Sequence, residues 1–202
     1  MKKFLLAGII LSLIFLVLFS GCGGGNSGTP TPAPTSTPCP TVGPGSYVIH
    51  YDGDPVTGCG ANTFAECLVH FNATKLQSYV GCNLVGIEIF FYNDGTPMTL
   101  NYTAEIFNGV GETVSSPGNL LYSNLETVTR GSWNQVNLNS PIPITSGMEI
   151  WAGFSISCPS AWPISIDNLP EVSKTSYFKN GTTGSFGELT TNLDIRLMVQ
   201  KN

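Results

Sequence analysis

The residues best suited to bind a metal ion form the stretch Tyr51-Asp52-Gly53-Asp54. Ca²⁺ takes several oxygen ligands from flexible loops, and glycine between two carboxylates lets such a loop turn tightly. Asp167-Asn168 could join this set from later in the chain. The spacing of an EF-hand loop is absent, and an ordinary Asp-Gly turn would use the same residues. The sequence therefore predicts a structural Ca²⁺ ion at Asp52 and Asp54, or a plain turn in its place.

Aromatic side chains are a second group that could bind a ligand, because the face of an aromatic ring can stack on a sugar ring. Large aromatic residues in a β-rich protein are, however, more often part of the core. Trp162 follows Ala161 and precedes Pro163 in an expected loop, so we expect its ring to be exposed. We predict a ligand-binding surface formed by Trp162, Tyr177 and Phe186.

Recognised catalytic motifs are absent from the sequence. There is no Gly-x-Ser-x-Gly elbow, no His-Glu-x-x-His and no Walker glycine loop. A catalytic triad needs a histidine between a nucleophile and a carboxylate, and nothing singles out partners for His50 or His70. Glycosidase carboxylates drawn from Glu88, Glu105 and Glu149 are the alternative, but outward strand positions are usually solvated. We therefore expect a protein that is not an enzyme.

The charge balance excludes one class of partner. Only 10% of the residues are charged, 13 are acidic and 8 are basic, and the basic residues form no cluster. Binding to a phosphate backbone requires a basic surface, so we expect no nucleic acid partner. Anionic lipid headgroups would not attract the chain either.

The first 21 residues have the pattern of a signal peptide. Lys2 and Lys3 precede an apolar run, Phe4–Phe19, that only Gly8 and Ser12 interrupt. The run is shorter than the roughly 20 apolar residues of a membrane-spanning helix. An uncleaved anchor, or cleavage without lipid, is the alternative to lipidation.

The end of this segment, Leu18-Phe19-Ser20-Gly21-Cys22, resembles the lipobox of prokaryotic lipoproteins, although Phe19 stands where that motif usually has leucine. The resemblance implies that residues 1–21 are removed and that the sulfur of Cys22 carries diacylglycerol. We therefore expect a protein outside the cytoplasm, held at the cell membrane or outer surface by its N-terminal lipid.

Residues 22–45 consist mainly of Gly, Ser, Thr and Pro, with alternating Thr or Ser and Pro at the centre. Such a composition cannot form a core, and alternating proline favours an extended, polyproline-like chain. We predict a spacer that lifts the following domain off the membrane.

Residues 46–202 are expected to form one all-β domain, an antiparallel β-sandwich. Apolar residues alternate with a period of two, and long helical periodicity is missing. The residues expected to share a buried face are Val85, Ile87, Ile89 and Phe91; Ile150, Ala152, Phe154 and Ile156; and Ile195, Leu197 and Val199. A helical turn is expected at Ala73–Tyr79. The expected strands lie near 47–51, 63–71, 82–92, 100–108, 120–127, 133–138, 149–157, 163–167, 175–179 and 193–200.

Several segments of this domain look like the galactose-binding-like jelly-roll domains appended to secreted prokaryotic surface proteins and peptidases. They are Gly131–Leu138, Gly147–Gly153 and Pro163–Asp167, with Phe64–Phe71 and Leu120-Leu121-Tyr122 fitting the same pattern. The resemblance implies a jelly-roll fold and an accessory module that binds carbohydrate or docks on a protein. It assigns no ligand residue.

Five cysteines remain once Cys22 is assigned to lipid. Outside the cytoplasm disulfides are the usual state of paired cysteines, so we expect at least one bridge within a set of four. The set comprises Cys59, Cys67, Cys82 and Cys158. Cys39 lies in the spacer and is expected to stay outside that bridge. Zinc is disfavoured because no Cys-x2-Cys pair is present, and a buried thiol is the alternative for Cys67.

Two functions remain from the sequence. The first is a lipid-tethered module that binds a polysaccharide or a surface protein. The second is a structural envelope lipoprotein without a small-molecule ligand, and a hydrolase ranks behind both.

Overall fold

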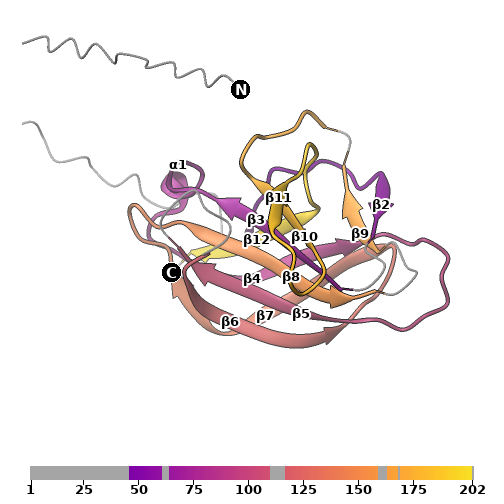
Figure 1. The fold of residues 1–202 in the computed structure, drawn as a ribbon. Coiled ribbons are helices and arrows are strands. Elements are labelled where there is room, and N and C mark those ends of the chain that lie inside the picture. Colours follow the sequence, from indigo (N-terminus) through magenta and orange to yellow (C-terminus); the bar gives the residue numbers. More distant parts are fainter. Residues whose placement is uncertain (1–45, 61–63, 110–116, 159–162, 168, 202) are drawn as a thin grey trace, which may run out of the picture. The chain divides into compact units, whose positions relative to one another are not determined.

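The computed structural model describes residues 46–60, 64–109, 117–158, 163–167 and 169–201. Nearly all of its regular structure is β-strand, with one short helical segment (Figure 1). In chain order the elements are β1 (Ser46–Ile49), β2 (Thr57–Cys59), β3 (Phe64–Phe71), α1 (Ala73–Leu76), the 3-10 helix η1 (Gln77–Tyr79), β4 (Cys82–Phe91), β5 (Asn101–Asn108), β6 (Asn119–Thr127), β7 (Ser132–Pro143), β8 (Ile150–Ser157), β9 (Ile164–Ile166), β10 (Ser176–Asn180), β11 (Phe186–Glu188) and β12 (Ile195–Lys201).

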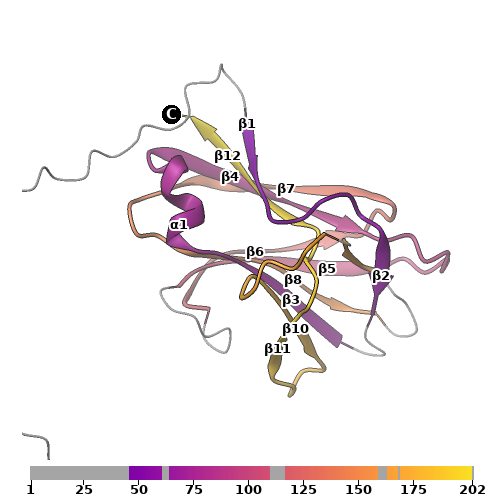
Figure 2. The same cartoon turned by 90° about the horizontal axis from the view of Figure 1, so that it is seen from above.

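The strands form two antiparallel sheets of six strands each. The first sheet has the order β1-β12-β4-β9-β2, with β7 paired to β4, and the second has the order β11-β10-β3-β8-β5-β6. Figure 2 shows the two layers, with β1, β12, β4 and β7 above β3, β8, β10 and β11. The predicted all-β antiparallel sandwich is therefore confirmed.

The core lies between the sheets and follows from the alternation of apolar residues. Ile150, Ala152, Phe154 and Ile156 of β8 face inward and are buried, as predicted. The Phe91 ring of β4 lies 5.0 Å from that of Phe154 in the opposite sheet. Because a buried aromatic side chain stabilises a fold by roughly 1.5 to 3 kcal/mol, such contacts hold the two sheets together.

One part of the predicted inward face is wrong. The pairing of β4 with β7 shifts register between Leu84 and Gly86. Leu84 is fully buried, whereas Val85 is only partly buried. A β-bulge breaks the period of two, because it adds one unpaired residue to a strand. Val85 therefore leaves the face that Ile87 and Ile89 share.

The short strands β2 and β11 were not predicted from the sequence. Each has only three residues and carries a central glycine, Gly58 or Gly187, so neither shows an alternating pattern. The strand β7 is longer than its predicted range, because its pairing with β4 continues to Pro143. The expected helical turn at Ala73–Tyr79 is confirmed as α1 followed by η1.

Candidate functional site

A pocket with a volume of about 170 Å³ opens next to the second sheet. Its lining combines polar groups with apolar surface and comes from segments that are far apart in the sequence. The lining residues are His70, Asn72, Glu149, Ser173, Lys174 and Tyr177.

Strand pairing brings these segments together. β3 lies between β8 and β10, so that His70 is paired with Trp151 and Leu68 with Tyr177. The backbone N–H of His70 donates to the carbonyl oxygen of Thr175 at 2.7 Å, which fixes the segment before β10 against β3. The pocket is therefore supported by paired strands rather than by loops alone.

His70 and Glu149 form the most closely defined pair in the pocket. The Nε2 atom of His70 lies 3.0 Å from a carboxylate oxygen of Glu149. The imidazole also stacks on the indole of Trp151, with ring centres 4.2 Å apart and an angle of 9° between the planes. His70 is thus held from two sides, and Glu149 presents a carboxylate in a fixed orientation.

An aromatic cluster underlies this pair. Trp151 is fully buried and packs on Tyr177, with ring centres 5.3 Å apart, while Phe107 and Phe186 pack against the cluster. The indole N–H of Trp151 is buried and has no hydrogen-bond partner among the described residues. Buried polar groups are nearly always paired, so this donor stands out, as do the unpaired buried oxygen atoms of Tyr51, Asp52 and Asp194 in the described chain.

The rim of the pocket contains the one described non-glycine residue with a positive φ angle. Lys174 has a φ of 61°. The carboxylate of Glu188 accepts a hydrogen bond from the backbone N–H of Lys174 and another, at 3.1 Å, from Ser173 Oγ. A left-handed backbone costs free energy in a residue with a side chain, and such strain concentrates at functional sites. Glu188 therefore holds the rim in a conformation that it would not adopt alone.

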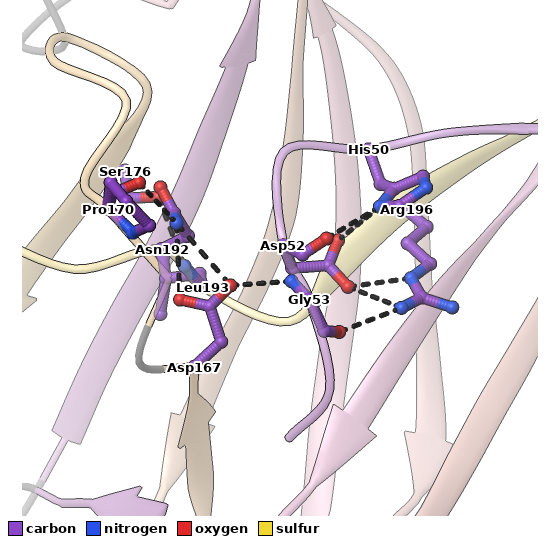
Figure 3. Close-up of polar contacts among 9 residues, drawn as sticks. All are labelled: His50, Asp52, Gly53, Asp167, Pro170, Ser176, Asn192, Leu193 and Arg196. Carbon is purple, nitrogen blue, oxygen red and sulfur yellow. Dashed lines mark hydrogen bonds and ion pairs between the residues drawn. The ribbon is translucent and has the colours of Figure 1, made fainter. Parts of the chain in front are cut away.

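A second polar cluster surrounds Arg196 on the first sheet (Figure 3). The Asp52 carboxylate, whose side chain is fully buried, accepts from Arg196 Nε at 2.7 Å and lies 2.6 Å from Arg196 Nη2. The same guanidinium donates to the carbonyl oxygen of Gly53 at 3.1 Å and lies over the Trp133 ring at 3.8 Å. His50 Nδ1 lies 2.8 Å from the backbone oxygen of Asp52.

Asp167 and Asn192 connect this cluster to the neighbouring loops. The Asp167 carboxylate accepts from the N–H of Gly53 at 2.5 Å and from Asn192 Nδ2 at 3.1 Å. A Cβ atom at position 53 would lie 2.6 Å from Cδ1 of Leu169, so that exposed side chain would have to move aside to admit a larger residue. These contacts join three loops of the described chain.

The predicted Ca²⁺ site can be compared with this geometry. The carboxylate of Asp52 is bound by Arg196, Asp54 is exposed, and Asn168 lies outside the described residues. Within the described ranges, no three histidine, cysteine or acidic side chains gather as metal ligands. Ca²⁺ binding at Asp52 and Asp54 stays a prediction, and the interaction seen for Asp52 is an ion pair.

Asp194 is a third buried acid close to this cluster. Burial raises the pKa of Asp194 to about 7, and the charges of Asp52 and Asp167 act in the same direction. Ser165 Oγ donates to its carboxylate at 2.5 Å and opposes that shift in pKa. Since the ordinary aspartate pKa is about 3.9, the folded state binds a proton that the unfolded state has already lost at mildly acidic pH.

We therefore expect the free energy of unfolding to fall as the pH rises from about 4 to about 8, by roughly 2 to 4 kcal/mol from Asp194. The stabilisation from Asp194 is fully present below about pH 4, which is the pKa of aspartate in the unfolded chain. It is lost as the pH rises through about 7, the pKa of Asp194 in the folded protein. Asp194→Asn, which keeps an oxygen acceptor for Ser165, should reduce this slope but not abolish it, because burial also raises the pKa of Glu105 to about 7. Asp54→Asn, at an exposed position, should leave the slope unchanged. Urea unfolding across this pH range measures the effect, and a wild-type stability that rises with pH would contradict it.

The cysteines differ from the prediction. Cys59 and Cys67 are free thiols and Cys158 is also present as a thiol, so no two of the four candidates are bridged to each other. Burial raises the pKa of Cys59 to about 11 and raises that of Cys67 further from its ordinary value. The neutral thiol is thereby favoured over the thiolate that forms disulfides. Cys82 is disulfide-bonded, and none of these three is its partner.

The predicted ligand-binding residues are only partly brought together. Tyr177 lines the pocket, and Phe186 packs against the aromatic cluster beneath it. Trp162, Cys22 and Cys39 lie outside the described residues.

His70 and Glu149 were considered from the sequence only as catalytic alternatives, while Asn72, Ser173 and Lys174 gave no signal. Of the three acids weighed as a glycosidase pair, Glu88 lies on β4 in the first sheet and Glu105 lies on β5 in the second. Glu149 comes directly before β8.

No protein-family model matches the chain, and no curated protein is similar to it at a significant level. Among the described helices, none has the length and apolar character needed to span a membrane.

Proposed function

We propose that this protein is a membrane-tethered, extracytoplasmic lipoprotein whose β-sandwich binds a carbohydrate in the pocket lined by His70, Glu149, Lys174 and Tyr177. The observation that carries the proposal is the composition of the pocket: a fixed carboxylate, cationic and amide donors, and an aromatic side chain meet at one hollow. It acts as a binding module without catalysis.

The lining groups match the surface of a sugar. Each hydroxyl group of a sugar can donate to a carboxylate such as Glu149 and accept from an ammonium or amide group such as Lys174 or Asn72. The C–H face of the ring is apolar and suits an aromatic side chain such as Tyr177. Since Glu149 and Lys174 carry opposite charges, a neutral sugar fits better than a strongly charged one.

The size of the pocket favours a single sugar unit. Sites for larger ligands usually have volumes of about 300 to 1,000 Å³. This pocket, at about 170 Å³, is smaller than that range. A terminal residue of a polysaccharide is the ligand that its dimensions suit.

A protein partner is the alternative ligand, since the resemblance to accessory jelly-roll domains includes protein docking. Stable protein interfaces bury at least about 1,200 Å² in total. A small polar hollow is a better match to a small polar ligand than to such a surface. Carbohydrate is therefore the first choice, and a structural envelope lipoprotein without a ligand is the second.

The proposal is tested by screening full-length, detergent-solubilised protein on an array of neutral and acidic glycans and on insoluble polysaccharides. We expect retention on glycans that share one terminal neutral sugar, and competition by that free monosaccharide. Failure to bind any glycan, with the protein folded by circular dichroism, would favour the structural lipoprotein.

A further inference from the structure

Three segments of the chain have the sequence Asn-x-Thr, in which x is not proline. They are Asn72-Ala73-Thr74, Asn101-Tyr102-Thr103 and Asn180-Gly181-Thr182. In proteins that leave the cytoplasm this motif accepts N-linked sugar when it lies on the surface. All three asparagines are exposed, so exposure alone does not select one of them.

Asn180 differs from the other two because its motif runs out of a strand end into a loop: Asn180 is paired on one side only, with Ala65 of β3, and the next two residues lie in the loop. It is the last residue of β10, and the loop 181–185 leads to β11. Thr182 is exposed, and so are the next three residues. Gly181 has a φ of 78°, and its N–H donates to the carbonyl oxygen of Phe64 at 2.7 Å, which fixes the turn. Figure 2 shows β10 and β11 as a hairpin that projects from the sandwich.

Asn101 lies in a very different environment. Its motif is part of β5, which is paired on both sides by β6 and β8. Tyr102, the middle residue, is 2% exposed and belongs to the core. Asn101 Oδ1 also accepts from Thr127 Oγ1 at 3.1 Å. The enzyme that attaches the sugar must hold all three residues of the motif. At Asn101 it would therefore have to pull Tyr102 out of the core.

Asn72 is engaged in two other ways. Its Oδ1 accepts from the N–H of Lys75 at 2.9 Å and caps α1. Asn72 also lines the pocket, so a glycan there would cover the ligand site. Of the three motifs, only the one at Asn180 has neither a core residue in its middle position nor an asparagine that caps a helix and lines the pocket.

We propose that Asn180 is an N-glycosylation site of the mature protein. Asn180 Nδ2 forms a bond to C1 of a sugar that a lipid carrier supplies through a diphosphate. The bond from C1 to the diphosphate oxygen breaks, the lipid diphosphate leaves with the electron pair, and Nδ2 loses one proton to a base of the transferase. With only 10% charged residues, the surface would gain hydration from such a glycan.

This inference depends on export of the chain, but it does not depend on the pocket. The full-length protein is purified from the cells that naturally make it, digested, and the peptide containing Asn180 is analysed by mass spectrometry. We expect a sugar mass on that peptide and none on the peptide containing Asn101. Deamidation of the Asn180-Gly181 pair is distinguished by its far smaller change in mass.

Two threonine variants provide the matched comparison. Thr182→Ala keeps Asn180 and the loop but destroys the motif, so the glycan should be lost. Thr183→Ala changes the next exposed residue and should leave the glycan in place. An unmodified Asn180 in the native protein, a glycan that survives Thr182→Ala, or a glycan on Asn101 with Asn180 bare would overturn the proposal. Glycan-array binding by the pocket is expected to be the same in either variant.

Discussion

Arg196→Met should lower the free energy of unfolding by roughly 3 to 5 kcal/mol, because it leaves a buried charge without its partner. The Asp52 side chain is fully buried and receives two guanidinium contacts from Arg196. Burial raises the pKa of Asp52, while the hydrogen bond and the charge of Arg196, and the charge of His50, lower it. Without Arg196, the charge of His50 still lowers the pKa of Asp52, but the larger influence that keeps this carboxylate ionised is lost.

A double-mutant cycle separates this charge effect from the loss of packing on Trp133. Asp52→Asn added to Arg196→Met removes the unpaired carboxylate, so the double variant should recover part of the lost stability. Lys201→Met, at an exposed position of the same strand, should change the stability little. Urea unfolding of the wild type, the single variants Asp52→Asn and Arg196→Met, the double variant and the Lys201→Met control gives the values. A loss below about 1 kcal/mol in Arg196→Met would mean that the pair is effectively solvent-screened.

Cys22→Ala should move the protein from the membrane fraction to the soluble fraction, or stop its processing. The reason is that the thiol to which the lipid would be attached is removed, while residues 22–45 are too polar to bind a bilayer. Metabolic labelling with a fatty-acid analogue measures the effect directly. Cys39→Ala, the other cysteine in the spacer, is the matched control and should label as the wild type does. Equal labelling of Cys22→Ala and wild type would contradict lipidation at Cys22.

The fold could be predicted because its long strands repeat a simple pattern. Residues 150, 152, 154 and 156 share the face of β8 that the two sheets bury, while Trp151 between them is also buried, in a separate cluster with Leu68 and Tyr177. The exceptions arise where the pattern is broken by backbone geometry. The bulge at Val85 and the three-residue strands β2 and β11 depend on pairing with distant strands, which a local pattern does not record.

The pocket could not be predicted in the same way. His70 and Glu149 are separated by 79 positions in the chain, and Asp52 and Arg196 by 144. Each pair is created by the order of strands in a sheet, and many orders agree with one set of strands. Tyr177 was identified because an aromatic ring can stack on a sugar, whereas the left-handed backbone of Lys174 is visible only in three dimensions.

The disulfide prediction failed for a related reason. Export makes a bridge the expected state, but a bridge also needs two sulfur atoms at bonding distance. Cys59, Cys67 and Cys158 remain thiols in the structure, and Cys82 is the member of the set that is disulfide-bonded. The sequence predicts the compartment in which the cysteines work, and only the fold decides which of them can pair.

The central claim is that the pocket beside the second sheet binds a neutral sugar. The most direct test is isothermal titration of the sugar found by the glycan screen into wild-type protein, Glu149→Gln and Glu126→Gln. Glu149 lines the pocket, whereas Glu126 lies on β6 at the opposite edge of the same sheet. Loss of a hydrogen bond to a charged acceptor costs about 1.5 to 3 kcal/mol, which is roughly a 10- to 150-fold weaker affinity. We expect that loss in Glu149→Gln with an unchanged unfolding midpoint, and wild-type affinity in Glu126→Gln; equal affinity in all three proteins would contradict the claim.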